Sequence, residues 1–197
     1  MKRIILLLLI FLLIGCVWAD NYSNVTVKGA NFEIPSQFAN GNSEANRYVY
    51  NDLRTFAILC VDDYLINNYG GFYNIADHTE PLTINDRPAM LLTTYNKYIQ
   101  ENVSYLYFPV NKSVYCICFQ GNNVNESISH IVESAPKSDV SSDTFYALLN
   151  EAFKEHQNRQ FLDSLANDDS DYVRNTHQQQ QNSRTDNLVQ WYLLTHW

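Results

Sequence analysis

Apolar residues fill both alternating sets of positions in several short segments near the middle of the chain. In RTFAILCV, residues 54–61, every residue from Phe56 to Val61 is apolar, so both sides of an extended strand would be apolar. The same two-sided pattern occurs at 89–95 and 113–119. A strand that is apolar on both sides needs cover on both faces, so these segments predict a sheet that forms a middle layer.

Turn residues separate these segments in the way expected for antiparallel strands. The segments VSYLYF and SVYCICF flank PVNK, which predicts a hairpin with its tip near Asn111 and Lys112. Residues 84–88, INDRP, predict a second turn. Shorter extended pieces are expected at 25–28 and 31–34, followed by a polar loop at 37–47.

Three segments of the chain have helical signals. A short helix is expected to start near Asp62 and end at Gly70 and Gly71, with a loop from 72 to 80. Asn123 and Glu126 have the spacing of a capping box before a helix that ends at Pro136. A longer helix is expected to start at Ser142 or Asp143 and to run toward Leu165.

These elements predict an α+β fold in one domain, residues 20–165. Its central sheet would be mostly antiparallel, with about 5–7 strands covered by helices, and would carry a long C-terminal helix. Residues 166–197 are polar and are expected to be disordered, except for the apolar ending LVQWYLLTHW at 188–197.

The first residues have the pattern of an export signal. Lys2 and Arg3 precede an unbroken apolar run from Ile4 to Ile14. The run is too short for a bilayer-spanning helix, which needs about 20 residues. Residues 1–19 are therefore predicted to be a signal peptide, and the protein is expected to be secreted or extracytoplasmic.

The end of this signal leaves three alternatives open. Val17 and Ala19 fit cleavage between Ala19 and Asp20. The sequence Leu13-Ile14-Gly15-Cys16 resembles a prokaryotic lipobox, in which Cys16 would carry the lipid. An uncleaved anchor is the third alternative.

The charge of the chain limits the classes of partner. The formal net charge is −8, and it becomes −10 when Lys2 and Arg3 are removed with the signal. An acidic domain has no electrostatic attraction to nucleic acid or to an anionic lipid surface. We therefore expect no nucleic acid partner, and membrane contact only through a retained or lipidated N-terminus.

Four short motifs together resemble those of the PsbP/Mog1-like family of α-β-α sandwiches. They are FEIP at 32–35, INDRPA at 84–89, YCICF at 115–119 and ISHIVES at 128–134. The chain departs from that family in lacking an aromatic Gly-Trp pair after the opening strand, and its long helix from Asp143 lies outside the pattern. The chain also resembles small, mostly uncharacterised exported proteins of archaea. The resemblance implies a non-enzymatic binding or assembly role, and it carries over no catalytic residue.

Few residues suggest reactive chemistry. Cleavage at Ala19 leaves Cys60, Cys116 and Cys118, which allow at most one disulfide. The CxC spacing of Cys116 and Cys118 on an apolar strand favours core packing over a metal site, and no cofactor or metal is expected. His78, beside Asp77 and Glu80, is the best candidate acid, base or ligand, although the polarity of a solvated loop is the favoured explanation.

Five Asn-x-Ser/Thr sequons are candidate glycosylation sites in an exported protein. They are Asn21, Asn24, Asn102, Asn111 and Asn125. Asn111 has a favourable place at the predicted hairpin tip, whereas Asn125 is equally well explained as a helix-start residue.

The sequence thus favours an exported, non-catalytic binding or accessory protein of the cell envelope, whose partner is an envelope protein or a small ligand. One alternative is a small extracytoplasmic enzyme of hydrolase type, for which a pocket joining His78 to acids or a thiol would be the sign. Another is a surface interaction protein that acts through its C-terminal tail.

Overall fold

A computed structural model describes the backbone of residues 22–177 and the side chains of residues 22–165. The predicted signal peptide with Cys16, the cleavage site at Ala19 and Asp20, the sequon at Asn21 and the segment 188–197 lie outside the described residues. The chain divides into two units, residues 1–155 and 156–197, and each is described by itself.

The first unit is built on a seven-stranded antiparallel sheet, as predicted. The strand order is β3-β4-β5-β9-β8-β7-β6. The strands are β3 (Asn42–Glu44), β4 (Arg47–Tyr50), β5 (Phe56–Cys60), β6 (His78–Ile84), β7 (Arg87–Asn96), β8 (Glu101–Val110) and β9 (Ser113–Gln120). The strands β5, β7 and β9 carry the two-sided apolar segments, and the β8–β9 turn falls at Asn111 and Lys112 as expected.

One side of the sheet is covered by a separate hairpin and a short helix, and we call it the hairpin face. The hairpin consists of β1 (Tyr22–Val27) and β2 (Ala30–Pro35), and the helix is α3 (Glu126–Ser134). Phe32 and Ile34 of β2 and Ile131 of α3 are fully buried in one cluster with Phe108 of β8. A short 3-10 helix, η1 (Ser36–Phe38), follows β2.

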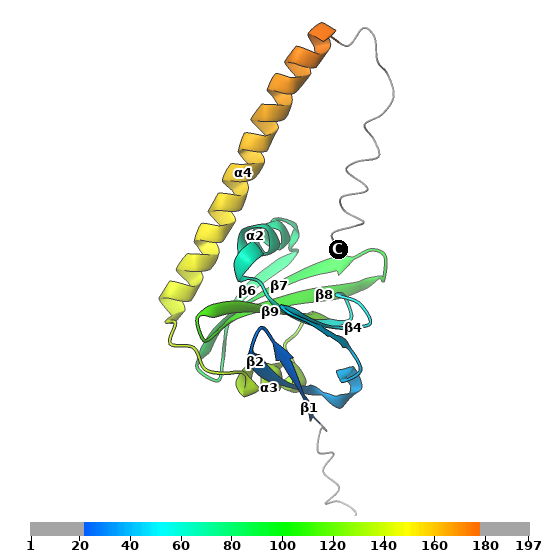
Figure 1. The fold of residues 1–197 in the computed structure, drawn as a ribbon, viewed down its shortest axis with the longest axis vertical. Coiled ribbons are helices and arrows are strands. Elements are labelled where there is room, and N and C mark those ends of the chain that lie inside the picture. The colour runs from blue at the N-terminus through cyan, green and yellow to red at the C-terminus, as the bar shows by residue number, and fades with distance from the viewer. Residues whose placement is uncertain (1–21, 178–197) are drawn as a thin grey trace, which may run out of the picture. The chain divides into compact units, whose positions relative to one another are not determined.

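The other side is covered by helices, and we call it the helical face. The 3-10 helix η2 (Asp62–Tyr64) leads into α2 (Leu65–Ile75), whose Tyr69 and Phe72 pack on Tyr107 and Tyr105 of β8. The first turns of α4 (Ser142–His177) add Phe145, Leu149 and Ala152 to the same cluster. Figure 1 shows α2 on one side of the sheet and β1, β2 and α3 on the other.

Three expectations about local structure are wrong. α2 does not end at Gly70 and Gly71, because the burial of Tyr69 and Phe72 on either side outweighs a cost of about 1 kcal/mol per helical glycine. Residues 72–80 are not a loop, since they finish α2 and begin β6. The loop expected at 37–47 contains the short edge strand β3.

Two helix ends also differ from the expectation. The cap of α3 is Asn125, whose Oδ1 accepts a hydrogen bond from Ile128 N at 2.9 Å, and not Asn123. The backbone of α4 is helical to His177, where disorder was predicted from residue 166. Residues 166–177 contain no Gly or Pro, so no strong helix breaker interrupts them.

The β6–β7 hairpin explains how a polar segment can form an edge strand. Asn85 and Asp86 both have positive φ, 47° and 62°, as a two-residue turn of type I′ requires. Ile84 and Arg87 then form a hydrogen-bonded pair, and alternation along β6 directs the backbone nitrogen of Pro81 away from β7. Proline there removes an N–H donor from the free edge, which hinders pairing with another strand.

Candidate functional site

His78 does not lie in a pocket with other reactive groups. It is the first residue of the edge strand β6, and its side chain is 62 % exposed. His78 Nε2 lies 3.6 Å from Glu80 Oε2, whereas Asp77 Oδ2 accepts a hydrogen bond from Tyr95 N at 2.7 Å. Asp77 therefore holds the chain beside β7. His78 and Glu80 form a solvent-exposed pair, which contributes little to the free energy of unfolding.

The three described cysteines are free and buried. Cys116 and Cys118 share the helical face, with their Sγ atoms 3.9 Å apart, and burial raises the pKa of the Cys116 thiol well above its usual value. Cys60 lies on the hairpin face, since its strand partner is Tyr115 rather than either cysteine. In this structure no disulfide joins Cys60 to the other two, and the thiols act as small core residues.

Two charged side chains, Asp62 and Lys28, lie near Cys60 at the start of β9. Asp62 Oδ1 accepts a hydrogen bond from Val114 N at 2.7 Å, and Asp62 Oδ2 lies 3.5 Å from Cys60 Sγ and 3.7 Å from Lys28 Nζ. Burial raises the pKa of the Cys60 thiol. A thiol that holds its proton is a weak nucleophile, so this arrangement favours a structural role for Cys60.

A second polar group joins the β1–β2 hairpin to α3. His130 Nε2 lies 2.8 Å from Glu33 Oε2, and the ring of Tyr22 lies over His130 with centroids 3.9 Å apart. Ser134 Oγ accepts a hydrogen bond from Glu33 N and donates one to Ile131 O, both at 2.9 Å. Both hydrogen bonds of Ser134 Oγ are made with backbone groups. They attach α3 to β2, and they do not activate the hydroxyl as a nucleophile.

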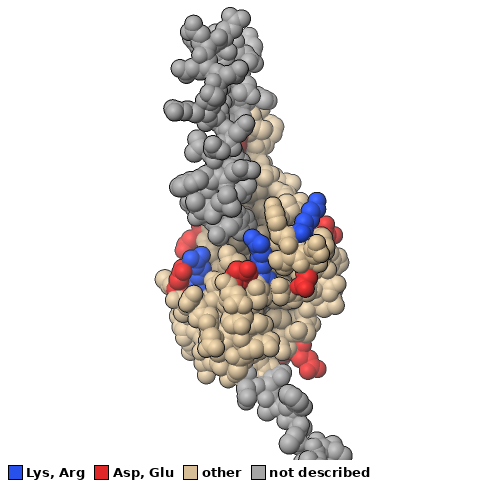
Figure 2. Space-filling view, turned by 90° about the vertical axis from the view of Figure 1, so that its right-hand side faces the viewer, with Lys and Arg blue, Asp and Glu red and all other residues tan. Residues whose placement is uncertain are grey.

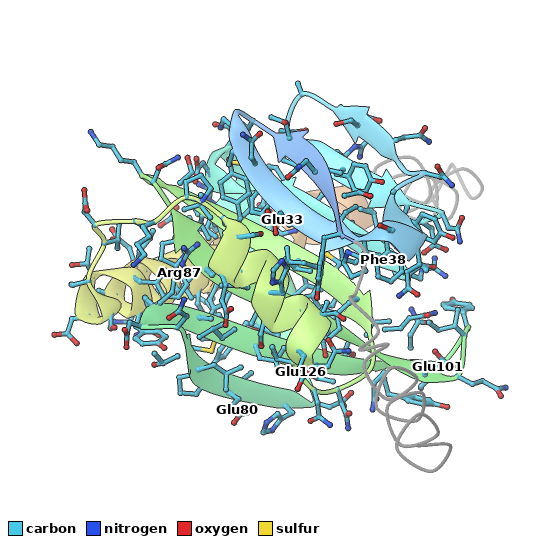
Figure 3. All side chains as sticks on the ribbon, turned by 90° about the horizontal axis from the view of Figure 1, so that it is seen from below. Glu33, Phe38, Glu80, Arg87, Glu101 and Glu126 are labelled. Atoms are coloured by element: carbon cyan, nitrogen blue, oxygen red, sulfur yellow. The ribbon has the colours of Figure 1, made fainter. Side chains whose placement is uncertain are left out.

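The same end of α3 lies beside a buried arginine. Arg87 is 8 % exposed, and its Nη2 donates a hydrogen bond to Ala135 O at 2.9 Å (Figure 3). A cation at the C-terminal end of a helix stabilises the last carbonyl groups. Arg87 thus connects the start of β7 to the C-terminal end of α3.

Two of the sequons lie on exposed turns or strands. Asn24 is exposed on β1, and Asn111 is exposed at the tip of the β8–β9 hairpin with a φ of 52°. Both positions leave room for a glycan.

The two other described sequons lie in tighter surroundings. Asn102 is half-buried opposite Tyr95, and the hydroxyl of its sequon residue Ser104 is buried and bonded to Thr93 and Gly121. Asn125 uses its side chain to cap α3.

A hollow lies at the end of the sheet, where the chain crosses from α3 to α4. It is an open cleft of about 530 Å³. The lining residues are Asn111, Lys112, Lys137, Asp139, Val140, Ser141 and Thr144. The crossing segment is held to the β8–β9 tip by Ser138, whose Oγ donates a hydrogen bond to Asn111 O. We call this hollow the lysine cleft.

The charges of the lysine cleft differ from the acidic average of the chain. Lys112 and Lys137 form no ion pair with another described residue, and Asp139 is the single described acid in the lining. The cleft also contains the first turn of α4, where Ser141 Oγ accepts a hydrogen bond from Thr144 N at 3.2 Å. The partial positive charge of a helix N-terminus adds to that of the two lysines.

The sequence pattern alone does not predict this cleft. The tip residue Lys112 and the helix start near Ser142 were both predicted, but Lys137 and Asp139 had no pattern that connects them to either. Their meeting depends on the path of residues 135–141 around the end of the sheet.

Other classes of site find little support in the described part of the chain. No cluster of three or more His, Cys, Asp or Glu side chains with metal-ligand geometry occurs among residues 22–165. None of the described helices combines the length and the apolar composition needed to cross a bilayer. The surface drawn in Figure 2 carries scattered Lys, Arg, Asp and Glu side chains with both signs interspersed.

The chain matches no protein-family model, and no curated protein is significantly similar to it in sequence.

Proposed function

We propose that the protein is an exported, non-catalytic binding domain whose lysine cleft takes a small ligand with a carboxylate or phosphate group. The export part of the proposal comes from the N-terminal signal pattern of residues 1–19. The observation that carries the binding part is the pair Lys112 and Lys137, which line one cleft without a described ion-pair partner.

The charge of the domain supports an anionic ligand in this cleft. The chain has a formal net charge of −8, whereas the cleft contains two cations and one acid. The charge of the cleft is therefore more positive than that of the chain as a whole. Lysine ammonium groups bind carboxylates and phosphates through charge-assisted hydrogen bonds. Nearby hydroxyl groups of Ser141 and Thr144 can add neutral hydrogen bonds.

The composition of the cleft supports binding rather than turnover. Its described lining contains neither histidine nor cysteine, and the Ser141 hydroxyl is engaged in the helix cap. A nucleophile needs an adjacent base to be activated, and no described histidine lines the cleft beside Ser141 or Thr144.

The test is a ligand titration of the protein followed by NMR or calorimetry, with inorganic phosphate and citrate as probes. The double variant Lys112→Ala and Lys137→Ala should bind at least about a hundredfold more weakly, because each of the two lost hydrogen bonds to a charged group costs about 1.5–3 kcal/mol. The matched control replaces Lys97 and Lys154, which are exposed outside the cleft, and should keep the parent affinity.

Two results would overturn this function. Equal weakening by both double variants would mean that the probes respond to net charge rather than to the cleft. Turnover in an unbiased hydrolase screen, lost in His78→Ala or Cys60→Ala, would establish the enzymatic alternative instead.

The export proposal has its own measurement, the mass of the N-terminal peptide of the protein taken from its native envelope. A start at Asp20 supports release by signal cleavage, whereas a diacylated Cys16 supports a lipid-tethered protein. An intact Met1 would contradict both.

A further inference from the structure

The second unit carries an apolar stripe that its own described residues do not cover. Phe161, Leu162 and Leu165 of α4 are 63 %, 62 % and 45 % exposed. At about 100° per residue, they lie within an arc of roughly 100° on one side of the helix. Asp163, on the opposite side, is charged and exposed. Large apolar side chains gathered on one side of an exposed helix indicate a binding surface.

We propose that this stripe binds the C-terminal segment of the same chain, Leu188–Trp197, so that the chain end folds back on α4. The segment LVQWYLLTHW is the most apolar sequence after residue 166, and its tryptophans and leucines match an apolar stripe in chemistry.

The length of the connecting chain allows this return. The helix rises about 18 Å from Leu165 to His177, its last described residue. Residues 178–187, which then lead to Leu188, can span up to about 33 Å when extended. The segment therefore reaches back along the helix to the stripe with slack to spare.

The size of the stripe favours this occupant over a second copy of the protein. Each large side chain buries at most about 150–250 Å², so three partly exposed ones supply well under the roughly 800 Å² per partner of a stable interface. A short linker holds its segment at an effective concentration of about millimolar, which allows a small surface to be occupied within one chain.

The tryptophans of the chain make this proposal directly measurable. The three tryptophans are Trp18, Trp191 and Trp197, so in the full chain with Trp18→Phe the emission comes from the C-terminal segment alone. We expect a blue-shifted emission maximum and acrylamide quenching that is several-fold weaker than in the same protein unfolded in urea.

Charge placed on the stripe should release the segment. In the Trp18→Phe background, Phe161→Lys with Leu165→Lys should shift the emission to the red and raise quenching to the urea value. The matched control Asp163→Lys adds the same side chain on the opposite side of the helix and should leave both signals unchanged. Far-UV circular dichroism of each variant verifies that the helix is retained.

Three outcomes would overturn the proposal. Tryptophans that are quenched equally in the native and unfolded protein would show that the segment is free. Protection that persists in the Phe161→Lys and Leu165→Lys variant would place the segment on another surface. Protection that appears only with concentration, together with a dimer in analytical ultracentrifugation, would assign the stripe to a second copy.

Discussion

The two faces of the seven-stranded sheet bury different aromatic residues. On the hairpin face the largest rings are mostly phenylalanines, and Phe32 meets Phe108 edge-to-face with centroids 6.4 Å apart. On the helical face tyrosines dominate. Those whose pKa is raised by burial are Tyr64, Tyr69, Tyr105, Tyr107 and Tyr146. On the hairpin face burial raises the pKa of one described tyrosine, Tyr115.

This difference separates two ways of stabilising one sheet. A phenylalanine core gains its stability from apolar area, which does not depend on pH. A tyrosine core also needs a partner for each buried hydroxyl, as Asn68 Oδ1 provides for Tyr107 at 2.7 Å. The helical face should therefore be the more sensitive to alkali and to the loss of single hydroxyl groups.

The largest effect is expected from a cavity on the hairpin face. Phe108→Ala removes a ring with 0 % exposure and should lower the free energy of unfolding by about 3–5 kcal/mol. Urea denaturation measures this change. Tyr98→Ala, at a side chain that is 90 % exposed, is the control and should stay within about 0.5 kcal/mol of the parent. Similar losses in both variants would contradict the assignment of the core.

Alkaline pH should weaken the helical face next. Burial raises the pKa of Tyr64 to about 12 from its ordinary value of 10.0. Below pH 10 the folded and unfolded states are both protonated. Between pH 10 and 12 the unfolded state loses its proton first, so stability falls as the pH rises.

Urea denaturation at several pH values between 8 and 12 tests this dependence. Tyr64→Phe should flatten the decline, because the substituted ring cannot ionise. Tyr98→Phe, at an exposed position, should leave the slope unchanged. A slope that is identical in all three proteins would show that Tyr64 does not contribute.

A smaller loss is expected from one hydroxyl group on the helical face. Tyr107→Phe removes the donor to Asn68 and should cost about 1 kcal/mol, the usual net value of a hydrogen bond. A double-mutant cycle with Asn68→Ala isolates the pair. A coupling energy near zero would mean that the buried hydroxyl is stabilised by another group.

The smallest effect should come from the surface. His130→Ala removes the contact with Glu33, where the side chains are 34 % and 49 % exposed, and should change stability by less than about 1 kcal/mol. Thermal unfolding near neutral pH is sufficient to measure it. A loss comparable to that of Phe108→Ala would show that this pair, rather than the apolar cluster, attaches α3.

The sequence predicted the elements whose signals are local. The two-sided strands around Phe56 and Ile117, the turn at Asn85 and Asp86 and the tip at Asn111 all follow from neighbouring residues. The strand β6 was missed because a loop was expected as far as Glu80, and only pairing with β7 makes these polar residues extended. The continuation of α2 through Gly70 was missed for a related reason, since Tyr69 and Phe72 gain their stabilisation from β8.

The sequence by itself determined that this protein has a buried antiparallel sheet, because alternation with period two on both sides is a property of consecutive residues. It also determined the acidic charge and the export pattern at the N-terminus. The tertiary structure alone decided which face each cysteine occupies and that Lys112 meets Lys137 in one cleft. Those facts depend on strand register and on the path of residues 135–141, which join positions that are distant in the sequence.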